Sequence, residues 1–375
     1  MAALQPTERS RFGYKRAARA IAGLPMPVAD LVAAGTLREV PFVGPSSERI
    51  VVEFVTTGAS PTVQAAIERS GQHAAVVARR ALRDGYLSHA VMAEALATEA
   101  APGIVSLADY RGDFQMHSTW SDGTESIASM VRGAQALGHT CLGITDHSYG
   151  LPIARGISMT QAAKQWAEVD RLNGRLRGAF RVFKGIEANI LADGSLDVQP
   201  EERRLFEYVV AAPHSLLRRA EDQTDRLANA VRAPGVAILG HPRGRMFNSR
   251  PGISADWDAV FELAAERRVA IEIDGNWHRQ DIDYLLAERA LAAGCLFALD
   301  SDAHSTGELR FSEYAVAHAR LAGVPAERVI NCWTDDRLEE WMRERRESTG
   351  KPARARRAGR SAPTPRRPPR GRPRS

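Results

Sequence analysis

The 375 residues are 44% hydrophobic and 25% charged with a formal net charge of +5, as in an ordinary globular protein, and the length fits one large domain with a smaller one. No apolar run approaches the roughly 18 residues of a membrane span, and the N-terminus lacks the apolar core of a signal peptide. Three scattered cysteines argue against a disulfide framework and a cysteine-based zinc site, so we expect a cytoplasmic protein without a membrane partner.

The first hundred residues predict short helices joined by turns of small residues, without strand-like runs. Residues 14–21 are an alanine-rich basic stretch, residues 37–58 predict a helix, a tight turn and a second helix, and residues 62–97 are again helical. The segment Ala101-Pro102-Gly103 marks a boundary. We therefore expect a small all-α domain over residues 1–100.

After Asp113 the pattern changes to strands that alternate with amphipathic helices. The predicted strands are residues 113–117, 141–146, 180–187, 208–214, 236–241, 269–274 and 295–302. Seven such β-α units predict parallel strands with helical crossovers, closed into a barrel over residues 108–345. In such barrels the active site lies at the C-terminal ends of the strands.

Side chains that bind metals stand at most of these strand ends. They are Gln115 and His117 with Asp122, Asp146 and His147, Glu187, His214, His241, and Asp302 with His304. An unpaired polar group at the end of a buried strand costs roughly 2–7 kcal/mol, so such residues rarely recur there outside metal and catalytic sites. Their recurrence at one rim predicts a polynuclear metal site.

The C-terminal residues carry the net positive charge. Residues 351–375 hold ten Lys or Arg and no acid, and without them forty basic residues face forty-five acidic ones. This stretch has too few apolar residues to fold, so we expect a disordered tail over residues 346–375. Arg370 and Arg372 are predicted DNA contacts, through non-specific attraction to polyanions or, alternatively, through the minor-groove hook that PRGRP resembles.

The order and wording of the strand-end motifs resemble the polymerase-and-histidinol-phosphatase (PHP) family of metal-dependent phosphoesterases, and most of all the PHP domain of bacterial family X DNA polymerases. The motifs are RGDFQMHSTWSDG (111–123), GITDHS (143–148), GIEANILADGSLD (185–197), APHS (212–215), GHPRGR (240–245) and DSDAHS (300–305). The resemblance covers about residues 110–322. It implies an α/β fold, a distorted (β/α)7 TIM-like barrel.

The resemblance also implies two or three divalent metal ions. One ion would be held by His117, Glu187 and Asp302, with Gln115 at its first ligand position. Glu187 would bridge to a second ion, held by His214 and His241. The third ion would be held by Asp122, His147 and His304. Mixed imidazole and carboxylate ligands favour Mn or Zn, with Mg or Fe as alternatives. The family has His-x-His where this chain has Gln115, a weaker and harder ligand, so the first ion would be weak, absent or biased toward Mn or Mg.

Phosphoester hydrolysis by metal-activated hydroxide follows from such a site, because bridging metals lower the pKa of a shared water and stabilise the attacking and leaving oxygens. The predicted catalytic residues are the ligands His117, Glu187 and Asp302 and the phosphate clamps Arg243 and Arg245, with Arg218 as a weaker clamp.

Residues 11–58 resemble the N-terminal domain of family X polymerases, including its helix-hairpin-helix element, through the stretches YKRAARAI and LREVPFVG. Arg16 and Gly44 are the predicted DNA contacts. Phe42 replaces the first glycine of the hairpin and Pro45 lacks an amide donor, which weakens phosphate contact. About fifty residues separate this element from the barrel, too few for a polymerase core, which excludes synthesis.

We therefore expect a phosphoesterase acting non-specifically on DNA, as a 3′–5′ exonuclease or a 3′-end-processing repair enzyme. One alternative is a small-molecule phosphomonoesterase of the histidinol-phosphatase type. A second alternative, which only Gln115 supports, is a catalytically weakened DNA-binding accessory protein. The sequence does not indicate an oligomeric state.

Overall fold

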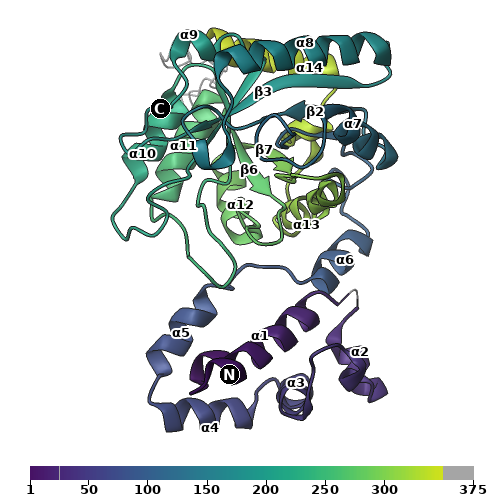
Figure 1. Ribbon diagram of the computed structural model, residues 1–375, viewed down its shortest axis with the longest axis vertical. Coiled ribbons are helices and arrows are strands. Elements are labelled where there is room, and N and C mark those ends of the chain that lie inside the picture. Colours follow the sequence, from purple (N-terminus) through teal and green to yellow (C-terminus); the bar gives the residue numbers. More distant parts are fainter. Residues whose placement is uncertain (25, 349–375) are drawn as a thin grey trace, which may run out of the picture.

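The computed structural model describes residues 1–24 and 26–348 of the chain. Its regular elements are helices up to residue 97 and an α/β barrel from residue 112 onward (Figure 1). The predicted contacts Arg370 and Arg372, with the rest of the tail from residue 349, lie outside the described residues.

The helical N-terminal region is confirmed, with one correction. Its elements are η1 (Ala2–Leu4), α1 (Glu8–Ala22), α2 (Val28–Ala34), η2 (Leu37–Glu39), α3 (Pro45–Thr57), α4 (Pro61–Ser70), α5 (His73–Ala81) and α6 (His89–Ala97). The predicted helix from residue 37 is only the 3-10 turn η2. Val40, which precedes Pro41, has ψ 125°, and the residue before a proline is disfavoured in the helical region.

No single helix in the described ranges is long and apolar enough to cross a membrane. By length and composition, α3 and α4 pass that test only together, as a pair bent by 114°.

The barrel has seven parallel strands that neighbour one another in chain order, as predicted. They are β1 (Gly112–Asp113), β2 (Cys141–Ile144), β3 (Arg181–Asn189), β4 (Tyr208–Ala212), β5 (Val236–Leu239), β6 (Ala270–Asp274) and β7 (Leu296–Asp300). β1 is shorter than the predicted strand because the chain then turns toward β7, where Met116 bridges Ala303 and the His117 N–H donates to the Ala303 carbonyl at 2.8 Å.

A single amide side chain links β1 to β7 at the seam, the place where the first and last strands of the barrel meet. Asn331 is fully buried, and its Nδ2 donates to the carbonyls of Gly112 and Leu299, both at 2.9 Å. Its Oδ1 accepts from the Leu299 N–H at 2.7 Å. Asn331 thus substitutes for strand hydrogen bonds that the short β1 cannot make.

Asn331→Ala should therefore destabilise the fold, because it leaves several buried backbone groups without partners at about 1–3 kcal/mol each. We expect a loss of about 2–5 kcal/mol in the free energy of unfolding, measured by urea denaturation. Asn229→Ala is the matched control, since Asn229 is exposed, donates to the Asp193 carbonyl and accepts from the exposed Arg232. Equal stabilities of the two variants would contradict this account of the seam.

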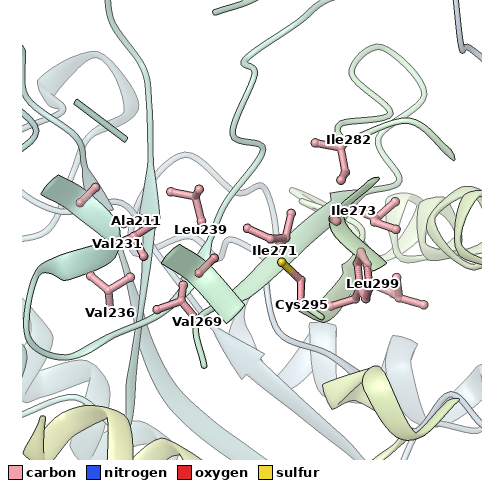
Figure 2. Packing of buried hydrophobic residues seen from close by; sticks show 14 of the residues in the cluster. Ala211, Val231, Val236, Leu239, Val269, Ile271, Ile273, Ile282, Cys295 and Leu299 are labelled. Atoms are coloured by element: carbon pink, nitrogen blue, oxygen red, sulfur yellow. The ribbon is translucent and has the colours of Figure 1, made fainter. Parts of the chain in front are cut away.

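Helices and 3-10 turns surround the strands. They are α7 (Ile127–Ala136), η3 (Pro152–Ala154), α8 (Met159–Leu176), α9 (Pro200–Arg203), α10 (Thr224–Arg232), α11 (Trp257–Arg267), α12 (Tyr284–Ala292), η4 (Thr306–Phe311), α13 (Ser312–Leu321), η5 (Ala326–Arg328), η6 (Ile330–Cys332) and α14 (Asp335–Glu347). Figure 2 shows the core between sheet and helices, where side chains such as Leu239 and Ile271 pack together.

The barrel interior is closed at the N-terminal ends of the strands. Trp341 and Met342 of α14 join the inward-facing Phe114, Phe183 and Tyr208 in one buried cluster. The Trp341 indole N–H also donates to the Arg268 carbonyl, just before β6. The opposite rim, at the C-terminal ends of the strands, is left to carry the polar residues.

The N-terminal helices dock on that opposite rim. The Leu87 N–H donates to Gln280 Oε1 at 2.7 Å, and Gln280 Nε2 donates back to the Leu87 carbonyl at 3.1 Å. Beside this pair, Leu87, Met92 of α6 and Ala317 of α13 form a buried apolar cluster. Gln280 belongs to the loop after β6, so the helices meet the barrel close to a strand end.

Candidate metal centre

The structure brings all nine predicted metal ligands into one network at the C-terminal ends of the strands. They are Gln115, His117, Asp122, His147, Glu187, His214, His241, Asp302 and His304. Glu187 lies within β3, and the others lie on the loops that follow β1, β2, β4, β5 and β7. Their roles as ligands remain predictions, whereas their proximity is a property of the fold.

Glu187 is the hub of the network. Its Oε1 lies 2.9 Å from His241 Nε2 and 3.3 Å from His214 Nε2. Its Oε2 lies 2.7 Å from His147 Nδ1 and 3.6 Å from His117 Nε2. Burial raises the pKa of Glu187, but the charges and hydrogen bonds of His147 and His214 lower it by more. The pKa of Glu187 therefore lies well below its usual range. An ionised carboxylate with a different imidazole set at each oxygen has the arrangement of a bridging ligand.

Asp122 is the centre of a neighbouring group. Its Oδ1 lies 3.3 Å from His304 Nε2, 3.6 Å from His147 Nε2 and 3.9 Å from His117 Nδ1. Burial raises the pKa of Asp122, but the hydrogen bond from His304 and the nearby histidines lower it to about 2. Burial lowers the pKa of His304, whereas Asp122 and Asp302 raise it to about 9.

Two groups of side chains place one ligand atom each within 4.8 Å of one another. They are His117, Asp122, His147 and His304, and His147, Glu187 and His214. The resemblance placed His117 with Glu187 and Asp302, and His147 only with the third ion. In the structure His117 Nε2 lies 3.0 Å from Asp302 Oδ1 and 3.6 Å from Glu187 Oε2, its Nδ1 also lies 3.9 Å from Asp122 Oδ1, and His147 faces both groups.

The donor set fits divalent cations. Gln115 Oε1 and His117 Nδ1 are buried and have no hydrogen-bond partner among the described residues. Leaving such atoms unpaired costs about 1–3 kcal/mol each, a cost that a bound cation removes. Imidazole nitrogens with carboxylate oxygens are the ligands that Zn and Mn accept. Gln115 donates its Nε2 to Glu187 Oε1 at 3.0 Å, so the substituted residue still belongs to the site.

Two of the predicted ligands have a positive φ, a backbone conformation that residues other than glycine rarely adopt. His241 has φ 23° and Asp302 has φ 50°. Such conformations cost about 1–3 kcal/mol each and cluster at functional sites, where the surrounding fold holds them in place. Here they occur on the loops after β5 and β7, which carry ligands of the same centre.

Comparison with known proteins finds relatives that match part of the chain. The chain is 32% identical over 241 residues to the DNA polymerase/3′-5′ exonuclease PolX of Bacillus subtilis, an alignment that covers 64% of this chain and 42% of that protein. It is 26% identical over 234 residues to the probable phosphatase YcdX of Shigella flexneri, covering 59% of this chain and 90% of that one. A probable phosphatase of Thermoanaerobacter gives 26% over 239 residues, covering 60% and 91%.

The chain is thus similar to PolX, which contains a PHP domain, and to proteins named probable phosphatases. No family model matches it. Among solved structures, the histidinol phosphate phosphatase of Lactococcus lactis, in complex with zinc, L-histidinol and phosphate, has a TM-score of 0.41 at 15% identity, covering 56% of this chain and 94% of that one. The chain spans about two fifths of the Bacillus polymerase but about nine tenths of the two phosphatases.

Asp146 supports the loops that carry the predicted ligands and does not face the centre. Its Oδ2 accepts from Ser118 Oγ and Gln165 Nε2, both at 2.6 Å, and its Oδ1 accepts from Ser121 Oγ at 2.5 Å. These bonds use both carboxylate oxygens. They fix the loop after His117 beside the loop that carries His147.

The structure differs from the prediction that Arg243 and Arg245 clamp a phosphate, because both guanidiniums already pair with Asp283. Arg243 Nη1 and Arg245 Nη1 both donate to Asp283 Oδ2, at 2.8 and 2.7 Å. Arg245 also donates to the Asp84 carbonyl at 3.0 Å and lies over the Tyr86 ring at 3.9 Å. Asp283 thus engages both guanidiniums, and Arg245 joins the N-terminal region to the barrel.

Arg279 is the cation that the sequence reasoning missed. Its guanidinium pairs with Asp302 and lies 3.5 Å from Asp274 Oδ2. Burial lowers the pKa of Arg279, but Asp302 and Asp274 raise it above the ordinary value. Its position in the sequence could have indicated it. Arg279 lies five residues after β6, the strand whose end carries no predicted ligand.

Further unpredicted partners are side chains that orient the histidines. Asn189 Oδ1, at the end of β3, lies 3.3 Å from His214 Nδ1, and a carboxylate oxygen of Glu272 in β6 accepts from the His241 N–H. Glu272 is fully buried, and burial followed by the charge of Asp274 raises its pKa well above the usual range. Asn189 lies within the motif GIEANILADGSLD but was not predicted as a site residue, and Glu272 lies in none of the quoted motifs.

The predicted DNA contacts of the N-terminal helices are not part of this network. The Arg16 guanidinium stacks over the Phe42 ring at 3.7 Å, and Gly44 is the N-cap of α3. Phe42 has φ 68°, a conformation that favours glycine, at the position where the hairpin of the family has one. DNA contact by Arg16 and Gly44 remains a prediction.

Proposed function

We propose that the chain hydrolyses phosphodiester bonds at the ends of DNA strands, as a 3′–5′ exonuclease or a 3′-end-processing enzyme. The observation that carries the proposal is Glu187, whose two oxygens face separate imidazole sets within 2.7–3.6 Å. The 32% identity to a protein named a 3′-5′ exonuclease supports DNA as the substrate.

The residues of the site fit a hydrolysis that needs no protein nucleophile. Divalent ions, when bound, supply an activated water and stabilise charge on the phosphoryl oxygens. Glu187 keeps a negative charge between the two imidazole sets, and Arg279 holds Asp302 in place. Asp146 orients the loop after His117 through Ser118. We propose Mn or Zn as the ions, with Mg or Fe as alternatives, because of the mixed donors.

A small phosphomonoester is the second candidate substrate. It is favoured by the probable phosphatases, of which the alignments cover about nine tenths, whereas only two fifths of the polymerase is covered. The weakened accessory protein has less support, because the Gln115 amide lies inside the network and leaves its oxygen unpaired.

The test compares two substrate classes on the same preparation. Labelled single- and double-stranded oligonucleotides, p-nitrophenyl phosphate and histidinol phosphate are incubated with Mn or Zn between about 50 and 200 mM salt. We expect shortening of the oligonucleotides from the 3′ end, with an affinity that falls steeply with salt because phosphate contacts release counterions. Intact oligonucleotides beside salt-insensitive hydrolysis of the small esters would replace DNA by the second candidate. Activity that survives Asp302→Ala would mean that this site is not the catalyst.

A further inference from the structure

Four arginines converge on one loop where the N-terminal helices meet the barrel. Arg79 in α5 donates to the Asn248 carbonyl at 3.4 Å, and Arg83, just beyond α5, donates to Asn248 Oδ1 at 3.3 Å. From the barrel side, Arg218 donates to the Ser249 carbonyl at 3.0 Å and to Ser249 Oγ at 3.1 Å. The fourth, Arg250, donates its Nε to the Gly244 carbonyl at 2.6 Å.

These guanidiniums are engaged by neutral acceptors only. Within the described ranges, none of the four forms an ion pair with a carboxylate, in contrast to Arg243 and Arg245, which share Asp283. A guanidinium has five N–H donors, so each of the four keeps donors unused. Burial lowers the pKa of Arg83, and the neighbouring charges of Arg79 and Arg80 lower it further, a repulsion that a bound anion would relieve.

Two of the four arginines lie on loops that also carry predicted metal ligands. Arg218 lies four residues after His214, and Arg250 lies in the loop that begins at His241. Burial lowers the pKa of Arg250, and the charges of Arg279 and Arg218 lower it further, whereas Asp281 compensates only in part. Arg279 pairs with the ligand Asp302. Figure 1 shows the loop between β5 and α11 descending from the barrel toward α5.

We propose that Arg79, Arg83, Arg218 and Arg250 form a cationic track for the backbone of a nucleic-acid strand whose end lies in the metal centre. The inference rests on the proposed function and specifies its substrate class, a polymer and not a single phosphate. The helix dipole accounts for cations at the end of α5, but not for the two barrel arginines on the same loop. A phosphomonoester reaches only the inner end of the track, whereas a strand reaches α5.

The test uses the full-length chain and a matched pair of double variants. Arg79→Gln/Arg83→Gln, the α5 double variant, removes one charge from α5 and one from the turn after it, four residues apart. Arg171→Gln/Arg175→Gln removes two charges from α8 with the same spacing. Arg171 and Arg175 are exposed, and α8 lies on the side of the barrel away from the N-terminal helices (Figure 1). Binding of a fluorescent single-stranded oligonucleotide is measured by anisotropy in EDTA over a salt series. Hydrolysis of the oligonucleotide and of p-nitrophenyl phosphate is measured with Mn.

The α5 double variant should bind the oligonucleotide about tenfold more weakly at low salt. The slope of log affinity against log salt should fall by about 1.4, since each phosphate contact on a single strand contributes about 0.7. Its KM for the oligonucleotide should rise by a larger factor than its KM for p-nitrophenyl phosphate. The α8 variant should bind and hydrolyse both as the parent does.

An unchanged slope and affinity in the α5 variant would overturn the track. Equal losses in both double variants would overturn it as well, because they would report net charge and not position. If the α5 variant loses affinity while the parent chain shortens no oligonucleotide, the track stands and the nuclease function falls. Thermal unfolding of each variant separates loss of binding from loss of the fold.

Discussion

Glu187→Gln should abolish most hydrolysis and release metal. The amide keeps the shape of the side chain but loses the charge that faces both imidazole sets, at 2.7 Å from His147 and 2.9 Å from His241. Loss of a residue that only orients a ligand costs about 10–100-fold, so we expect at least about 100-fold for the hub itself. Bound metal should fall by at least one ion per chain, measured by elemental analysis beside p-nitrophenyl phosphate turnover.

Glu339→Gln is the control for that experiment. Glu339 lies in α14 at the opposite end of the barrel, and its side chain is 53% exposed. The control should keep the metal content and the turnover of the parent chain. A Glu187→Gln protein that retains both full metal content and full turnover would remove Glu187 from the centre.

Asp283→Asn should be among the most destabilising single changes outside the metal centre. The Asp283 carboxylate is 6% exposed and holds Arg243 and Arg245 together, and Arg245 is itself 3% exposed. Breaking a buried ion pair by removing one charge typically costs about 3–5 kcal/mol, because the partner is left unpaired in the interior. Urea denaturation should show this loss, whereas the number of metal ions bound to the folded protein should not change.

The same experiment has a matched surface control. Asp258 pairs with Arg289 at 2.9 Å, and the two side chains are 66% and 49% exposed. Exposed pairs contribute about 0–1 kcal/mol, so Asp258→Asn should have little effect. Similar losses for the two variants would contradict the structural role that we assign to Arg243 and Arg245.

The barrel and its ligand set could be predicted because both follow local rules. A parallel strand buried on both faces is an apolar run, so a His or Asp at its end stands out, as His214 after β4 does. The carboxyl ends of parallel strands meet at one rim, so ligands at six separate strand ends predict one site without any tertiary information.

The arginines could not be assigned in the same way. Arg243 and Arg245 follow His241 directly, but a turn in which the Gly244 N–H donates to the His241 carbonyl at 2.8 Å leads the chain away from the centre. Their partner Asp283 is about forty residues away in sequence, so local spacing carries no information about the pair. A long flexible side chain can reach several partners, and only the tertiary fold decides which one.

Two adjacent residues of the loop after β6 serve different parts of the molecule. Arg279 forms an ion pair with Asp302 in the metal centre. The Gln280 side chain accepts from the Leu87 N–H and donates to the Leu87 carbonyl. A barrel cut free of residues 1–97 would lose the second anchor while keeping the first. Such a fragment would therefore be an unfaithful substitute for the whole chain in any measurement of catalysis, however well it folds.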